Sequence, residues 1–407
     1  MNAKKITLDN IREQFPALKR KINNKQIVFF DGPGGTQMPG RAIKAISNYY
    51  RYYNSNTHGQ FQTSRQTDHI IKAARENIAA LLGAEGPHTI SIGQNMTTIN
   101  FALSRALSRQ LQAGDEILIT QLDHEANRGP WLTLRESGVK VREVKLLQEG
   151  VLDYEDMQNK VNENTRLIAM GMASNAIGTV NNVRLGRQLA YDVGAMLLLD
   201  AVHYVPHFPI DVRELGVDLL LCSSYKFYGP HLGFLYAKPG VLDSLPVDRL
   251  STQEQHAPYR IETGTLNHAS LTGVNATVAF ISALGEGKTI RENILSGIEH
   301  INAHEQALAK TMYQELSGIK KIKIIGPGYG NLQRAPTISF IHEKLRPDYV
   351  CHMLSKEGIA AWDGHFYAQK AMEVLGLQEK GGTTRIGISM YNSEVDIERL
   401  IHVLKKI

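Results

Sequence analysis

The stretch "AMLLLDAVHYVPHFPIDVRELGVDLLLCSSYK", residues 195–226, carries the clearest indication of the fold. It holds two apolar runs that each lead to an ionisable side chain: Asp200 ends the first run, and Lys226 follows just after the second. Uninterrupted apolar runs of this kind are typical of strands buried on both faces of a parallel sheet. Ligands of such sheets lie outside the carboxyl ends of the strands. We therefore expect Asp200 and Lys226 to face one crevice, with a single crossover between their strands.

The same alternation extends over residues 26 to about 270. Short apolar runs are separated by amphipathic segments such as "SRQTDHIIKAARENIAALLGA", which Gly83 closes. The runs are "QIVFF", "HTISI", "DEILIT", "VKVREV", "RLIAM", "AMLLLD", "VDLLLC" and "LGFLYA". Strands that alternate with helices predict a mainly parallel sheet covered on both faces.

After about residue 280 the pattern changes. The long helical stretch "ENILSGIEHINAHEQALAKTMYQEL" is followed by the strands "KIKII" and "PTISFI", a helix near 346–357 and the strand "TTRIGIS". A final helix begins at Ser393, with Asp396 three residues after this cap, a spacing that favours the start of a helix. These elements predict a smaller α+β domain.

The chain of 407 residues is long enough for two domains. We assign residues 22–280 to a large domain, and residues 1–21 together with 281–407 to a small one. The N-terminal helix is expected to pack on the small domain.

Composition and charge exclude several classes of protein. Apolar residues make up 43% and charged residues 21% of the chain, which is ordinary for a soluble globular protein. The net charge of +5 is spread along the sequence, so we expect no nucleic-acid partner. The start of the chain does not resemble a signal peptide, and the sequence holds no apolar run of membrane-spanning length. We expect a cytoplasmic protein without a membrane partner.

The two cysteines, Cys222 and Cys351, cannot form a zinc cage by themselves, so no metal site is predicted. Low cysteine usage in a chain of this size fits a reducing compartment. Cys222 lies within an apolar strand and Cys351 within a helical stretch. Reactive cysteines need exposure and a lowered pKa, so we interpret both as structural thiols.

Asp200 and Lys226 point to a particular cofactor. A plain buried ion pair would contribute little net stability, which favours a chemical role. Lysine becomes a nucleophile when desolvation lowers its pKa. Pyridoxal 5′-phosphate needs such a lysine, and it needs a carboxylate that keeps its ring nitrogen protonated. The segment "IGQNMTTIN", residues 92–100, adds a strand end, a polar turn and a helix start that favours an anion.

Seven segments then show a resemblance to a known family. They are "VFFDGPGGTQMP", "DHEANRGPW", "SNAIGTVNNV", "LLLDAVHYVPH", "SSYKFYGPHLGFLY", "IETGTLN" and "TRIGISMYNSEVDIERL". Their order and spacing resemble the class V aminotransferase family of pyridoxal-phosphate enzymes, within it the cysteine desulfurases and selenocysteine lyases. The resemblance implies an α/β protein with the fold of the type I pyridoxal-phosphate transferases. It also implies that the large domain binds the cofactor and that the small domain is α+β.

The resemblance also implies roles for individual residues. Lys226 would hold the cofactor and later move the α-proton of the substrate, Asp200 would pair with the ring nitrogen, and His124 would stack on the ring face. Arg385 would bind the substrate carboxylate through its two-pronged guanidinium, while Gly34 would let the backbone approach the substrate. The other expected cofactor contacts are Asn95, Met96 and Ser223 at the phosphate, Asn175 and His203 near the phenolic oxygen, Tyr225 beside the lysine, and Thr265 at the phosphate of the neighbouring subunit. The last contact implies a homodimer.

Each of these side chains also has a purely structural alternative. His124 could cap a helix or fill the core, and Asn175 could be a turn residue before Gly178. Ser223 could be a strand-end hydroxyl bonded to backbone, and Arg385 could form a surface ion pair.

The sequence departs from the desulfurases at Tyr225, where they usually have a histidine just before the lysine, and at one loop. Where the family has an arginine and, five residues on, a cysteine, this chain has Trp362 and Tyr367. A phenol cannot carry sulfur as a persulfide. We therefore expect a pyridoxal-phosphate enzyme that acts on an amino acid by β-elimination, a C–S lyase, with Tyr367 or His365 as acid near the leaving group. Tyr367 could equally only pack the loop.

Other activities remain open at this stage. Aminotransfer and epimerisation begin at the same α-carbon, and a non-catalytic, cofactor-binding partner of a sulfur-assembly system is a further alternative. The sequence favours elimination narrowly over the first two.

Overall fold

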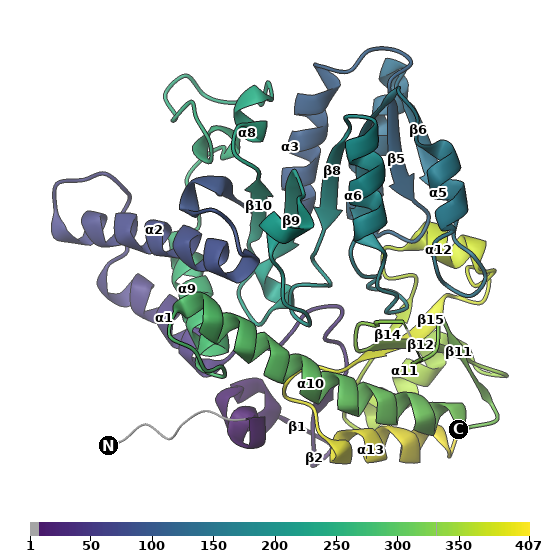
Figure 1. The fold of residues 1–407 in the computed structure, drawn as a ribbon. Helices are drawn as coiled ribbons and strands as arrows, with labels where there is room; N and C mark the ends of the chain where they lie inside the picture. The colour runs from purple at the N-terminus through teal and green to yellow at the C-terminus, as the bar shows by residue number, and fades with distance from the viewer. Residues whose placement is uncertain (1–7, 331) are drawn as a thin grey trace.

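A seven-stranded sheet forms the larger part of the molecule (Figure 1). The computed structural model describes residues 8–330 and 332–407. In spatial order the strands are β4 (Ile90–Gly93), β10 (Gly233–Ala237), β9 (Leu219–Ser223), β8 (Met196–Asp200), β7 (Thr165–Gly171), β5 (Glu116–Thr120) and β6 (Lys140–Val144). β10 runs antiparallel to both of its neighbours, and the other pairs are parallel. The predicted mainly parallel sheet is confirmed.

Helices cover both faces of this sheet because its strands are apolar on both sides. In β8, Leu197 and Leu199 join one core cluster, while Leu198 between them joins another. This alternation follows from the two-residue period of a strand. One face is covered by α3 (Met96–Ser108) and α4 (Glu125–Leu132). The other is covered by α2 (Gln62–Leu82), α5 (Tyr154–Lys160), α6 (Val183–Asp192), α7 (Val212–Leu215) and α9 (His268–Ser282).

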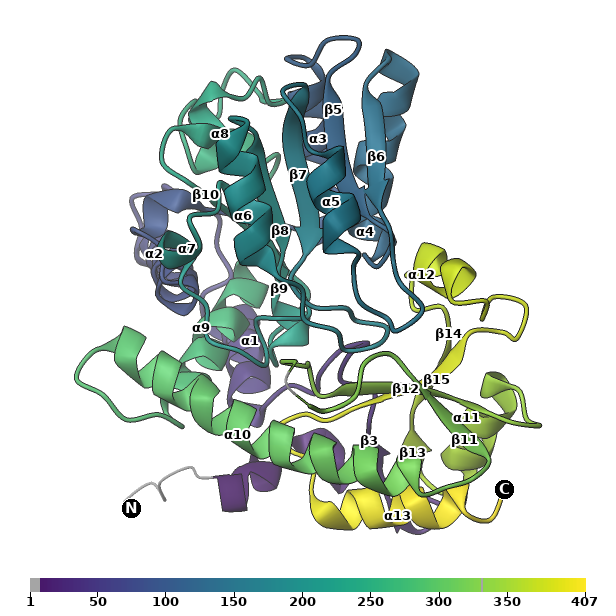
Figure 2. The same cartoon turned by 45° about the vertical axis from the view of Figure 1, so that its right-hand side comes forward.

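A second sheet of four antiparallel strands lies in the C-terminal part of the chain. Its order is β11 (Ile322–Ile325), β12 (Thr337–His342), β15 (Thr383–Gly387) and β14 (Trp362–Gly364). The helices α10 (Ile290–Ser317), α11 (Pro347–Lys356) and α13 (Glu394–Leu404) share its core, whereas α12 (Gln369–Val374) packs into the core of the large sheet. The long helix α10 runs beside α13 below this sheet (Figure 2). Ser393 and Asp396 form a capping box at the start of α13, as their spacing predicts.

One apolar run lies outside the large sheet. β3 (Val28–Phe29), within "QIVFF", pairs in parallel with β13 (Ile359–Ala360) instead. Asp31 then bridges to Gly387 at the end of β15. This run does not join the large sheet because its partner strand lies about 330 residues further along the chain. A partner so distant cannot be predicted from the local apolar pattern. The segment after β3 is therefore joined to the smaller sheet.

The N-terminal segment contacts both halves of the molecule. Arg12, in a 3-10 helix over Leu8–Gln14, bonds to the carbonyl of Tyr391 and to Asp396. Phe15 packs its ring against Tyr391 and also against Phe280 of α9. Residues 1–7, assigned from the sequence to the small domain, lie outside the described residues. The domain boundaries themselves stay a prediction.

The remaining elements are short or peripheral. They are β1 (Lys21–Ile22), β2 (Lys25–Gln26), α1 (Gly40–Tyr52), which packs on α9, and α8 (Val241–Ser244). Within residues 8–330 and 332–407, no helix is long and apolar enough to cross a membrane.

Candidate active site

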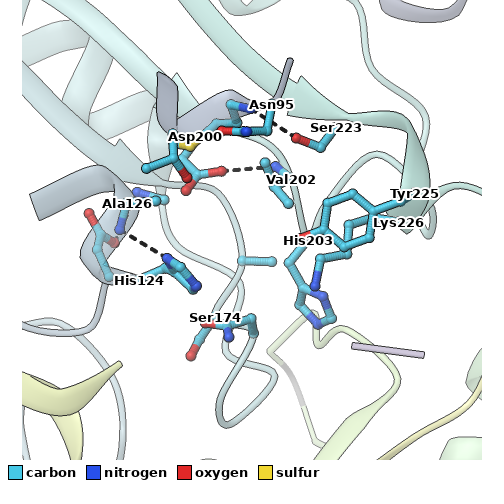
Figure 3. A pocket seen from close by; sticks show the side chains of 16 residues that line it. Asn95, His124, Ala126, Ser174, Asp200, Val202, His203, Ser223, Tyr225 and Lys226 are labelled. Carbon is cyan, nitrogen blue, oxygen red and sulfur yellow. Dashed lines mark hydrogen bonds between the residues drawn. The ribbon is translucent and has the colours of Figure 1, made fainter. Parts of the chain in front are cut away.

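Asp200 and Lys226 line one cavity at the carboxyl ends of β8 and β9 (Figure 3). Asp200 is the last residue of β8, and Lys226 follows β9 by three residues. The cavity has a volume of about 610 Å³, its open mouth included, and both side chains are buried in its wall. The crevice predicted from the sequence is therefore present, and the structure brings its two ionisable groups together.

The Lys226 amine is buried and held by backbone. Its Nζ donates to the carbonyl of Gly34 at 3.0 Å and also to the carbonyl of Pro33. Burial and the nearby charge of Arg385 together lower the pKa of Lys226 to about 7, against the opposing effects of Asp200 and Asp31. The lowered pKa increases the unprotonated fraction of this amine near neutral pH.

Asp200 lies near a second buried carboxylate. Its Oδ1 accepts the N–H of Val202 at 3.0 Å, and burial raises the pKa of Asp200 to about 7, helped by the charge of Asp123. Asp123 also lines the cavity and accepts the N–H of Gly171 and the amide of Asn127, both at 3.0 Å. Two carboxylates close together would favour a proton on the ring nitrogen of pyridoxal phosphate. Asp123 was not predicted from the sequence, although it directly precedes His124 in "DHEANRGPW".

His124 lies at the start of α4 and also lines the cavity. Its Nδ1 accepts the N–H of Ala126 at 2.9 Å, so the capping alternative holds. Burial lowers the pKa of His124 to about 4, and the charges of Lys226 and Arg385 add to this effect. A neutral, flat ring in the wall of the cavity suits contact with another ring.

His203 and Asn175 lie on the same cavity. His203 Nε2 is 3.0 Å from Oγ1 of Thr337, and its buried Nδ1 has no hydrogen-bond partner among residues 8–330 and 332–407. An unpaired buried nitrogen is costly unless a ligand contacts it. Asn175 donates its amide to the carbonyl of Phe366 at 2.9 Å, so it is more than a turn residue.

The start of α3 forms a cradle for an anion. Asn95 caps the helix by accepting the N–H of Thr98 at 2.9 Å, and the N–H of Met96 donates to Ser223 Oγ at 3.2 Å. A Cβ on Gly233 would lie only 2.3 Å from the backbone of Asn95, so only glycine lets β10 come this close. Free N–H groups at a helix start favour a phosphate. The Lys226 amine, the carboxylates of Asp200 and Asp123, and the start of α3 therefore fit pyridoxal phosphate as a group.

A wider cleft opens from the cavity and shares Lys226, His124 and Asn175 with it. It encloses about 1560 Å³, open mouth included. Arg385, from β15, lies in its wall, only 3% exposed and with its guanidinium 4.1 Å from the centre of the Phe366 ring. The alternative of a surface ion pair is therefore wrong. Burial lowers the pKa of Arg385 to about 9, so the side chain stays charged at neutral pH.

The loop after β14 closes one side of the cleft. Trp362, His365 and Tyr367 all line it. Phe366 and Tyr367 both have left-handed backbone conformations, with φ of 54° and 57°, which are unfavourable for residues other than glycine. The N–H of Glu125 donates to the Tyr367 carbonyl at 2.7 Å and so helps hold this shape.

Thr265 and the cysteines lie away from the cavity and the cleft. Thr265 lines a separate surface depression. Burial raises the pKa of the Cys222 thiol, and it raises that of Cys351 to about 12. Neither thiol lines the cavity or the cleft. Both therefore behave as the structural thiols that the sequence indicates.

Asp200 ends one strand, Lys226 comes after the adjoining parallel strand, and both side chains line one cavity. The fold and this site define an enzyme that depends on pyridoxal phosphate, with the type I fold. More particularly, the chain belongs to the aminotransferase class-V family, which matches residues 28–400.

Its relatives include proteins described as cysteine desulfurases. The chain is 30% identical to a probable cysteine desulfurase of Halalkalibacterium halodurans, over 97% of both proteins. It is 31% identical to a cysteine desulfurase of Synechococcus elongatus, over 98% of this chain and 63% of that protein. The apo structure of a cysteine desulfurase from Thermococcus onnurineus superposes with a TM-score of 0.88 at 26% identity, covering 99% of this chain and 98% of that one.

Proposed function

We propose that the protein is a lyase that removes the sulfur substituent from the β-carbon of a sulfur-containing amino acid. The reaction would convert the substrate and one water into a thiol, pyruvate and ammonium. The observation that carries this proposal is Lys226: it lies where the cavity meets the cleft, and neither cysteine lines either space. An amine at this place can move a proton, but the chain offers no thiol there to accept sulfur.

The cofactor supplies a ring that stabilises negative charge at the α-carbon of the substrate. Lys226 would hold the cofactor and take the α-proton at Nζ. Asp200 would keep a proton on the ring nitrogen, and Arg385 would bind the substrate carboxylate beside the Gly34 backbone. The remaining proposed contacts are His124 and Tyr225 beside the ring, Asn95, Met96 and Ser223 at the phosphate, and Asn175 and His203 at the phenolic oxygen.

We also propose that Tyr367 or His365 gives a proton to the leaving sulfur. Both line the cleft into which the substrate side chain would extend. Tyr367→Phe should then slow turnover of substrates with poor leaving groups more than of those with good ones. An equal effect on both kinds of substrate would assign Tyr367 to loop packing.

The assembly and location of the protein are proposals as well. We propose a homodimer in which Thr265 of each subunit reaches the site of the other. We propose a cytoplasmic location because cysteine usage is low.

Lys226→Ala tests the assignment directly. The variant should lose the visible absorbance of the lysine-bound cofactor and at least about a hundredfold in turnover, because both need the amine. Lys310→Ala, at an exposed position on α10, is the matched control and should behave like the parent protein. Retained turnover in Lys226→Ala would refute the proposal.

A substrate screen then separates the reactions. Elimination releases pyruvate, ammonia and a thiol in equal amounts, and free cysteine would give sulfide. Aminotransfer leaves the aminated cofactor and a keto acid without ammonia, and epimerisation produces only the mirror-image amino acid. No product from any amino acid would favour a non-catalytic partner in sulfur assembly.

A further inference from the structure

Three exposed aromatic side chains lie at the mouth of the cleft, outward of Lys226 and Arg385. Phe101 is 37% exposed, Trp362 53% and Tyr367 68%, and all three line the cleft. They come from α3, from β14 and from the loop before α12, so chain segments far apart in sequence converge on one opening. Exposed apolar surface gathered in a concave site is typical of ligand binding.

Trp362 lies directly beside the proposed carboxylate site. A Cβ built on Gly34 would lie 3.2 Å from the indole nitrogen of Trp362 and 3.3 Å from a guanidinium nitrogen of Arg385. The indole and the guanidinium therefore border the same small space above Gly34. A carboxylic acid bound by Arg385 would have the Trp362 ring as its neighbour.

Tyr367 lies beside His124 and the start of α4. Its ring centre is 5.4 Å from that of His124, and its carbonyl accepts the N–H of Glu125 at 2.7 Å. The unfavourable left-handed conformation of Tyr367 persists because such contacts fix it. The backbone of Tyr367 is thus held in place, and its phenol ring lines the cleft.

The charges in the cleft argue against an anionic side chain on the substrate. Among the described residues that line it, the lysines and arginines are Lys226 and Arg385, and both are buried at its inner end. The acids Glu125 and Asp363 also line the cleft, and Glu125 pairs with Arg128 at 3.1 Å. Because Arg385 would bind the first carboxylate and Lys226 lies at the inner end, a second carboxylate would find neither a free lysine nor a free arginine among the described residues that line the cleft.

We infer that the cleft accepts an amino acid whose side chain ends in an aromatic ring, such as S-benzyl-L-cysteine. Phe101, Trp362 and Tyr367 would be the residues that determine this specificity, because aromatic rings pack well against one another. The inference rests on the proposed function, in which Arg385 binds the substrate carboxylate.

Binding of unreactive carboxylates to the cofactor-loaded protein tests this inference. Calorimetry should show 3-phenylpropanoate binding at least about tenfold tighter than propanoate, because its ring is buried in the cleft. Succinate, with a second carboxylate in place of the ring, should bind no tighter than propanoate. S-benzyl-L-cysteine should likewise have a higher kcat/KM than S-carboxymethyl-L-cysteine.

Substitutions show whether the aromatic wall is responsible. Trp362→Ala should remove most of the preference for 3-phenylpropanoate over propanoate, while Trp362→Phe should keep most of it. Tyr191→Ala is the matched control, because Tyr191 is 69% exposed on α6 and lines neither the cavity nor the cleft. It should leave the affinities for both acids unchanged.

The outcomes separate the inference from the proposed function. Equal affinity for 3-phenylpropanoate and propanoate, or tightest binding of succinate, would overturn the inference while leaving turnover by Lys226 intact. The same result would follow if a second copy of the chain covered the three aromatic residues. If Arg385→Gln failed to weaken binding of any of the acids, the carboxylate site, and the inference with it, would be wrong.

Discussion

Burial of one amine sets the pH at which the site can react. Lys226 binds a carbonyl carbon only when unprotonated, and its pKa falls from 10.5 to about 7. The rate at which cofactor-free protein acquires the visible band of the lysine-bound cofactor should therefore rise with pH around a midpoint near 7. Arg385→Gln should move this midpoint upward, because the guanidinium is the largest charge effect that lowers the pKa of Lys226.

Stopped-flow absorbance over pH 5 to 10 measures this midpoint, and n-butylamine provides the reference for an ordinary amine. A midpoint near 10.5 in the protein would contradict the low pKa. The same pKa shift makes the stability of the fold depend on pH. Between about pH 7 and pH 10.5 the unfolded chain binds a proton at Lys226 that the folded chain does not bind, so the free energy of unfolding rises with pH in this range.

Residues of the site differ in how well the sequence reveals them. Asp200 and Lys226 end apolar runs, so their shared crevice can be predicted from strand geometry alone. Asp31 and Asp123 could not be picked out, because an acid after a short strand is ordinary in any loop. Arg385 is buried by contacts with Asn175 and Phe366, which lie in other segments of the chain. Its neighbours in the sequence therefore cannot distinguish a buried arginine from one in a surface ion pair.

Helix α10 contributes one buried acid to the support of the lysine segment. Glu305 is fully buried, with Oε2 2.7 Å from His207 Nδ1 and Oε1 accepting the hydroxyl of Tyr228 at 3.1 Å. Tyr228 lies two residues after Lys226 and has a left-handed φ of 70°. Its hydroxyl also accepts the N–H of Met390 at 3.2 Å. Glu305 thus ties the lysine segment to the long helix.

Removal of this acid should destabilise the fold strongly. Glu305→Ala leaves His207 and Tyr228 without their buried partner and should cost about 3 kcal/mol of unfolding free energy. Glu305→Gln keeps an acceptor and should cost less. Glu299→Ala, at an exposed position of the same helix, should change stability by less than about 0.5 kcal/mol. Urea denaturation measures all three, and equal midpoints for Glu305→Ala and Glu299→Ala would contradict the assigned role.

Elements are predicted best where their own period settles them. The strands of the large sheet and the capped helix α13 follow from apolar runs and from Ser393 and Asp396. The pairing of Val28–Phe29 with Ile359–Ala360 could not be predicted in this way. Two residues are too few to show a periodic apolar pattern, and the partner strand is distant in the sequence. The 3-10 helix near the start of the chain is similarly fixed by its contacts with Tyr391 and Asp396.

At the scale of the molecule, the site lies between the two sheets. Lys226 and Asp200 follow strands of the large sheet, whereas Arg385 and Trp362 belong to strands of the small one. Arg385 donates to the carbonyl of Asn175 at 3.0 Å and so links the two sides directly. Relative movement of the sheets would therefore change the distance between the amine and the carboxylate site.

Thr265 is an exposed residue at the end of the segment "IETGT", residues 261–265, which is anchored at Glu262. Glu262, three residues earlier, pairs with both terminal nitrogens of Arg75 at 2.7 Å and accepts the N–H of Ile92 at 2.6 Å. These bonds fix the segment to α2 and β4, while Thr265 itself is exposed in a depression apart from the cavity. A fixed segment with an exposed end suits contact with another subunit.

Mixing two inactive variants tests whether Thr265 serves the neighbouring site. Lys226→Ala lacks the amine, and Thr265→Glu places a negative charge where the partner's phosphate would bind. In a mixed dimer one site then combines an intact Lys226 with an intact Thr265 from the other chain, while the second site carries both defects. Unfolding and refolding an equal mixture should therefore restore about a quarter of the parent activity, since half of the dimers are mixed and each has one good site. If Thr265 acted within its own chain, every site would keep one defect and the mixture would stay inactive.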